Sequence, residues 1–138
     1  MKKAGFLLII FFWTTIGFGA EKQNPIDFEV EKLLNKDPST AGQMRAFSQG
    51  YDLWDEELNK AYQDLMSFLE NDQEGKTALR NSQRLWIKFR EQEFIFLQKL
   101  YAKKEGTMYR PMHCASRMEM VKARSRVLRD RLALLKDY

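Results

Sequence analysis

The sequence predicts an all-α fold, an antiparallel bundle of three long helices preceded by a short N-terminal helix. Proline and glycine are scarce, with 3 and 7 copies in 138 residues, which favours long helices over strands and turns. Three long segments repeat apolar residues at intervals that alternate between three and four, the spacing of one helix face. The 10 Phe, 5 Tyr and 3 Trp residues can build one apolar core, and the chain length is that of a single domain.

Residues 1–19 are predicted to be a signal peptide rather than part of the domain. Two lysines precede an apolar run at residues 4–18, and two glycines at its end place small residues where a signal peptidase reads the chain. We expect cleavage near Gly19-Ala20. The alternative is a membrane anchor, but a run of about 15 apolar residues is shorter than the roughly 20 that a span requires. The short lysine start is typical of bacterial export, so the expected location is periplasmic or secreted.

Residues 20–38 are expected to form an N-terminal segment with one short, loosely held helix at about residues 25–35. Asn24 is the predicted cap, and Pro25 suits the first turn because its missing N–H costs nothing there. The helix should end before Pro38, since the residue that precedes a proline is pushed out of the helical region.

Residues 39–138 are expected to form the helical domain, whose first long helix has an unbroken apolar stripe. Thr40 and Gln43 have the spacing of a capping box, which predicts Thr40 as the cap. Gly50 lies inside the helix, where it either permits a close helix approach or is merely tolerated at a cost of about 1 kcal/mol. The stripe consists of Met44, Phe47, Tyr51, Trp54, Leu58, Ala61, Leu65 and Phe68.

The second long helix is expected at about residues 76–104, and the third from within residues 107–111 almost to Tyr138. The second is apolar over more than a third of its circumference, so we expect it to be the middle element, contacted from two sides. Short connections favour antiparallel neighbours. The stripe of the second helix is Leu79, Trp86, Phe89, Phe96 and Leu100, broadened by Ile87, Phe94, Leu97 and Tyr101; that of the third is Cys114, Met118, Val121, Ser125, Leu128, Leu132 and Leu135.

Charge is distributed unevenly along the chain. Residues 21–73 carry twelve acidic and five basic residues, whereas residues 74–138 carry sixteen basic and seven acidic ones. A basic half can indicate nucleic-acid binding. An exported protein rarely meets nucleic acid, however, and the two halves must pack together. We therefore expect charge complementarity between the helices and no nucleic-acid partner.

A polar cluster in the first long helix is a candidate site, formed by Asp55, Glu56, Glu57 and Asn59. Paired carboxylates can perform acid–base catalysis. Asp55 and Asn59 share one helix face, however, while the two glutamates point away from it. No His, Cys or Ser lies beside them in the sequence, so nothing indicates an activated nucleophile. We therefore expect a structural role for Asp55 and Asn59, and a protein that is not an enzyme.

Gln83, Trp86 and Arg90 share one face of the second long helix. A partly buried arginine requires a carboxylate, and Asp55 or Glu93 could provide it. We predict that Arg90 pairs with Asp55 across the helix interface; the alternative is an arginine that binds an external anion. The predicted structural polar motif is therefore Asp55, Asn59, Gln83, Trp86 and Arg90.

His113 and Cys114 are adjacent, and they are the only His and Cys of the chain. Neighbours on a helix cannot both reach one ion, so we expect no metal site, and nothing in the sequence indicates a cofactor. A single cysteine excludes an intramolecular disulfide. Cys114 is then either a small buried residue of the stripe or a free thiol available for an intermolecular bridge.

Four motifs in this order resemble the lysozyme-inhibitor LprI N-terminal domain family, over roughly residues 37–132. They are Ser39-Thr40 with Met44; Tyr51 followed by Asp55-x-Glu57-Leu58-Asn59-x-x-Tyr62; Gln83-x-x-Trp86 with Phe89-Arg90; and Gly106-Thr107 with Pro111 and Cys114. Members of that family usually carry four cysteines, of which only Cys114 is present here, so the bridges between helices are missing. The usual Gly-Gly-Ser before the last helix is reduced to Gly106-Thr107, which makes this chain a divergent member.

The resemblance implies an all-helical, exported, non-enzymatic domain, and two functions are considered. The first is inhibition of a lysozyme (a muramidase) or binding of another envelope protein through an acidic face, for which the candidates are Asp52, Glu56 and Asp64. Many lysozymes are basic, so opposite charge would favour the encounter. The second is a structural or interaction module of the bacterial cell envelope without inhibitory activity. It would use the wide apolar second helix, or arginines of the third helix, for a protein or an anionic surface. The arginines of that helix face are Arg117, Arg124 and Arg131.

The resemblance leaves the oligomeric state open, and after signal cleavage the protein should not be an integral membrane protein.

Overall fold

The computed structural model describes residues 24–137, so the predicted signal peptide lies outside the described part. Residues 24–137 contain four helices and no strand, which confirms the predicted all-α bundle. The helices are α1 (Pro25–Lys36), α2 (Thr40–Phe68), α3 (Gln73–Ala102) and α4 (Tyr109–Lys136). The predicted short helix and three long helices are therefore all present.

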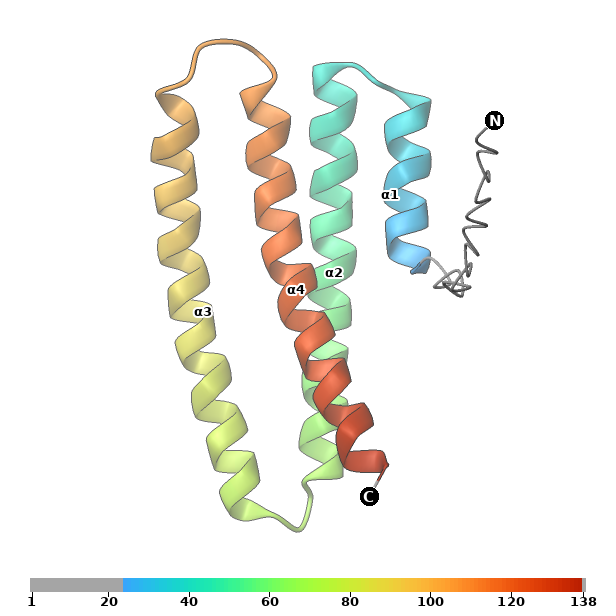
Figure 1. Ribbon diagram of the computed structural model, residues 1–138, viewed down its shortest axis with the longest axis vertical. Coiled ribbons are helices and arrows are strands. Elements are labelled where there is room, and N and C mark those ends of the chain that lie inside the picture. Colours follow the sequence, from blue (N-terminus) through green and yellow to red (C-terminus); the bar gives the residue numbers. More distant parts are fainter. Residues whose placement is uncertain (1–23, 138) are drawn as a thin grey trace, which may run out of the picture.

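The helices stand side by side, with α3 at one edge, α1 at the other, and α4 and α2 between them (Figure 1). Consecutive helices run in opposite directions, so α2 and α4 run parallel to each other (Figure 1). These two helices supply most of the core, with one residue from α1 and one from α3. The buried apolar residues of this cluster are Val30, Trp54, Leu58, Ala61, Leu65, Leu79, Met118, Val121, Leu128 and Leu132.

Side chains cap the first three helices. Asn24 Oδ1 accepts a hydrogen bond from the amide of Ile26 at 2.9 Å, as predicted. The capping box at Thr40 is wrong, because Ser39 Oγ accepts from the amide of Gly42 at 3.1 Å and Thr40 is already helical. The side chain of Gln43 donates instead to the carbonyl oxygen of Pro38 at 2.8 Å. A hydroxyl stands at both positions, so spacing alone could not select between them.

The expectation that the short helix is loosely held is also wrong. Val30 of α1 is buried in the core. Asp27 lies 2.7 Å from Lys122 Nζ and 3.1 Å from Arg126 Nη2, both on α4. Apolar burial and two ion pairs therefore attach α1 to the central pair of helices.

Gly50 lies where α1, α2 and α4 approach one another closely. A Cβ atom added there would lie 2.5 Å from Met118 Sδ and 2.6 Å from Val30 Cγ2, both far inside ordinary contact distance. The structure therefore supports the interpretation that Gly50 permits a close helix approach, rather than being merely tolerated.

The predicted place of α3 in the middle of the bundle is wrong. Leu79 and Gln83 are the buried residues of this helix, whereas Phe89, Phe96 and Leu100 of the predicted stripe are exposed. The reason is that α2 and α4 bury their stripes against each other, which leaves α3 a partly covered place at the edge. The outer side of α3 is consequently an apolar surface.

Candidate functional site

The predicted Asp55–Arg90 pair is present at the edge of the α2–α3 contact. Arg90 Nη1 lies 3.3 Å from Asp55 Oδ1, and the two side chains are 19% and 36% exposed. Asn59 Nδ2 donates to the other carboxylate oxygen at 3.4 Å. The geometry thus joins three members of the predicted polar motif, and Asp55 occupies the position at which an external anion would neutralise Arg90.

Arg124 of α4 organises the other two members of the motif. Its Nε donates to Gln83 Oε1 at 3.0 Å, and its Nη2 donates to Ser82 Oγ at 3.1 Å. The guanidinium carbon of Arg124 lies 5.8 Å from the centre of the Trp86 ring. The guanidinium carbon of Arg90 lies 5.3 Å from the same ring centre. Burial, and secondarily the charge of Arg131, lower the pKa of Arg124. The sequence reading placed Arg124 on an outer basic face and missed this role.

A second arginine, Arg117, packs on aromatic rings and holds the C-terminal half of α3. The guanidinium carbon of Arg117 lies 4.5 Å from the Phe94 ring centre and 5.3 Å from that of Tyr51. The two rings are themselves 6.0 Å apart. Arginines and aromatic rings thus fill the layer between α3 and the central helices, which explains how α3 is held with few buried aliphatic side chains.

Two of the three predicted acidic-face residues are open to solvent. Asp52 and Glu56 are exposed on α2, and neither has an ion pair with the residues that the structure describes. Asp64 is different, because Arg129 Nη1 lies 2.5 Å from its carboxylate. Arg129 also bonds Glu57 at 2.6 Å, and its hydrogen bond lowers the pKa of Asp64. Asp64 therefore belongs to an internal ion-pair network rather than to an open acidic face.

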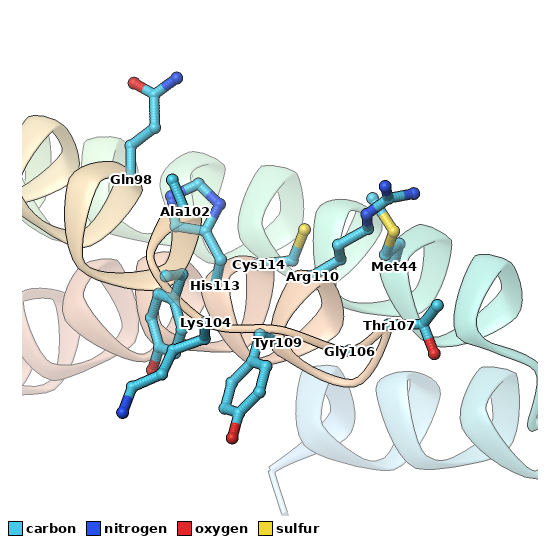
Figure 2. A pocket seen from close by; sticks show the side chains of 11 residues that line it. Met44, Gln98, Ala102, Lys104, Gly106, Thr107, Tyr109, Arg110, His113 and Cys114 are labelled. Carbon is cyan, nitrogen blue, oxygen red and sulfur yellow. The ribbon is translucent and has the colours of Figure 1, made fainter.

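A hollow of about 530 Å³ lies at the turn between α3 and α4 (Figure 2). Lys104 and Tyr109 point away from Arg110, so the charged groups do not converge (Figure 2). Burial, and secondarily Arg117, lower the pKa of His113. The full lining is Met44, Gln98, Tyr101, Ala102, Lys104, Gly106, Thr107, Tyr109, Arg110, His113 and Cys114.

Cys114 is a half-buried free thiol rather than a fully buried stripe residue. It lines this hollow and a smaller one of about 210 Å³, beside Ser48, Tyr51, Asp52 and Arg117. No group of three or more His, Cys, Asp or Glu side chains within residues 24–137 is arranged to hold a metal ion. Nor does any helix in that range combine the length and apolar character needed to cross a bilayer.

Comparison with known families places these features in context. A family model described as "Lysozyme inhibitor LprI" matches residues 34–128, more than half of the chain. The chain belongs to the LprI lysozyme-inhibitor family. The match begins near the end of α1 and ends within α4. No curated protein and no solved structure matches the chain.

The segment that matches the LprI family contains the whole arginine layer described above. The Asp55–Arg90 pair and the Arg124–Gln83 hydrogen bond both lie within it. Asp52 and Glu56, the open acidic residues of α2, lie there too. The aromatic residues Phe47 and Phe94 stand near two positions where the family resemblance leads one to expect cysteines, and both pack against the apolar core.

Proposed function

We propose that this protein is an exported, non-enzymatic lysozyme inhibitor that binds a muramidase through the outer face of α2. The observation that carries the proposal is the match to the LprI lysozyme-inhibitor family over residues 34–128. The binding face is assigned by elimination among the five acidic residues of α2. Asp55, Glu57 and Asp64 are paired with arginines.

Asp52 and Glu56 are the acidic residues that remain exposed on the middle of α2. They stand four residues apart, so their carboxylates lie on the same side of the helix. Gln49 and Asn59 are exposed beside them and can donate hydrogen bonds. A basic enzyme approaching this face would meet two carboxylates that form no ion pair with a described residue, which favours a fast and salt-sensitive encounter.

The test is inhibition of a basic lysozyme, measured as the rate of lysis of bacterial cell walls with increasing inhibitor. The Asp52→Lys/Glu56→Lys variant should weaken binding about tenfold or more, since each tenfold in Kd corresponds to about 1.4 kcal/mol. Added salt should weaken the wild-type complex and have little effect on the variant. Circular dichroism should show that both proteins are equally folded.

The matched control is Glu91→Lys/Glu105→Lys, which makes the same change of charge at two exposed positions away from α2. It should inhibit like the wild-type protein. Undiminished lysis in the presence of excess folded wild-type protein would contradict the proposed function. Equal loss in both variants would contradict the assignment of the α2 face, because net charge alone would then explain the effect.

A further inference from the structure

The outer side of α3 carries an exposed apolar stripe, interrupted midway by Gln92 and Glu93, that the fold does not bury. Leu85, Phe89, Phe96 and Leu100 follow one another at intervals of four, seven and four residues, so they lie along one line of the helix. They are 67%, 55%, 56% and 40% exposed. Ile95, about 110° around the helix from the centre of this line, is 46% exposed. From Leu85 to Leu100 the stripe runs about 22 Å along the helix axis.

Basic side chains flank this stripe. Lys88 and Lys99 lie about 90° and 70° around the helix from its centre on one side, Arg84 lies further round, and Lys103 continues the line just beyond the helix. All four are exposed, and none has an ion pair with a described residue. Of the acidic residues of α3, Glu74 is at its start and Glu91 is on the far side, whereas the half-buried Glu93 borders the stripe on the side opposite the lysines. An apolar line bordered by lysines and arginines is typical of a helix that lies at the surface of an anionic membrane.

A groove extends the apolar surface at the beginning of α3. Its volume is about 370 Å³, and Arg131 is its charged member. Ala78 and Ser82 precede Leu85 by seven and three residues and continue the same side of the helix. The lining is Leu65, Leu69, Ala78, Leu79, Ser82, Arg131, Leu134 and Leu135, so the end of α4 contributes as well.

Charge and area decide what covers this face. A second copy of the chain would bring Lys88 and Lys99 of both copies against each other. The five apolar side chains expose on the order of 500 Å², less than the roughly 800 Å² per partner of a standard stable interface. A basic lysozyme would be repelled. An anionic bilayer takes up the apolar side chains at the depth of the headgroups and places the lysines beside phosphates.

We propose that α3 docks this protein onto the surface of an anionic phospholipid membrane. The helix lies parallel to the bilayer, with Phe89 and Phe96 inserted and Lys88 and Lys99 at the headgroups. The protein is then peripheral, and α1 stands at the opposite edge of the molecule from the membrane (Figure 1).

The experiment measures co-sedimentation of the protein, exported and processed by a bacterial host, with vesicles of phosphatidylglycerol and phosphatidylcholine. The wild-type protein should bind the mixed vesicles and not vesicles of phosphatidylcholine alone. Phe89→Ser/Phe96→Ser should lower the partition at least tenfold and leave thermal unfolding unchanged, because neither ring belongs to the core. Lys88→Glu/Lys99→Glu should lower it as strongly.

The matched control is Phe28→Ser/Phe68→Ser, which removes two exposed rings from α1 and α2. It should bind vesicles like the wild-type protein. Absence of wild-type binding to anionic vesicles at low salt would overturn the proposal. So would concentration-dependent self-association without lipid that Phe89→Ser/Phe96→Ser abolishes, since the stripe would then be a contact between copies. Lysozyme inhibition by the α3 variants is measured separately, because it depends on the α2 face and not on membrane binding.

Discussion

Replacing Gly50 by alanine tests whether α1, α2 and α4 touch at this residue. Helix propensity alone predicts that the change stabilises the protein by about 1 kcal/mol. The structure predicts the opposite sign, because the new methyl group would lie 2.5 Å from Met118 Sδ and 2.6 Å from Val30 Cγ2. Forcing an extra methyl group into a packed core costs about 1–3 kcal/mol. Met118 is flexible, but Val30 is β-branched and fixed on another helix, so the cost should lie towards the upper end of that range.

The expected net result is a loss of about 1–2 kcal/mol, or about 4–8 °C in Tm for a domain of this size. Thermal and urea unfolding, followed by circular dichroism, measure it. Ser48→Ala, two residues away and exposed, is the control and should change stability by less than about 0.5 kcal/mol. Adding Val30→Ala to Gly50→Ala should cost less than Val30→Ala alone, because the smaller side chain makes room. A more stable Gly50→Ala protein would refute the close contact.

Two further predictions concern Ser125 and Arg129 of α4. The Ser125 hydroxyl is fully buried without a hydrogen-bond partner among the described residues. Ser125→Ala should therefore raise the free energy of unfolding by about 1 kcal/mol. A lower free energy of unfolding in the variant would mean that the hydroxyl is hydrogen-bonded. Arg129 lowers the pKa of Asp64 below its ordinary value of 3.8, so this pair contributes fully above that pH, and its contribution is lost as the pH falls through the lowered pKa. Arg129→Met should therefore make the free energy of unfolding less dependent on pH below about 4. The exposed Arg131→Met variant is the control. An unchanged pH dependence in Arg129→Met, or the same change in the control, would contradict this prediction.

The sequence alone predicts the central pair of helices well, because each buries one side. Trp54, Leu58 and Leu65 of the first stripe are buried, as are Val121 and Leu128 of the last. A single buried side leaves a periodic signal that needs no knowledge of the partner helix. The ends of the stripes were less predictable, since the burial of a terminal residue depends on where the neighbouring helix stops. The family resemblance was also recognisable, because its motifs are local.

The position of α3 could not be read in the same way. This helix carries apolar residues around more than a third of its circumference, and periodicity does not say which of them are covered. Packing between α2 and α4 decides the matter, since Ala46, Gly50 and Ser125 are small and let these helices approach closely. Bulky rings such as Trp86 keep α3 further away. The role of Arg124 was hidden for a related reason, because its partner Gln83 is 41 residues away on another helix.

Charge pairing explains why the two halves of the chain have opposite charge and where the remainder lies. The acidic residues of the first half that face inward meet basic residues of α4, as Asp27 does with Lys122 and Glu57 with Arg129. Three of the eight basic residues of α4, Lys122, Arg126 and Arg129, thus form ion pairs inside the molecule. On α3, by contrast, Arg84, Lys88 and Lys99 are exposed and outside every described ion pair. Exposed positive charge and exposed apolar side chains therefore occur together on the helix at the edge. Cation and apolar surface together match an anionic bilayer better than either feature would alone.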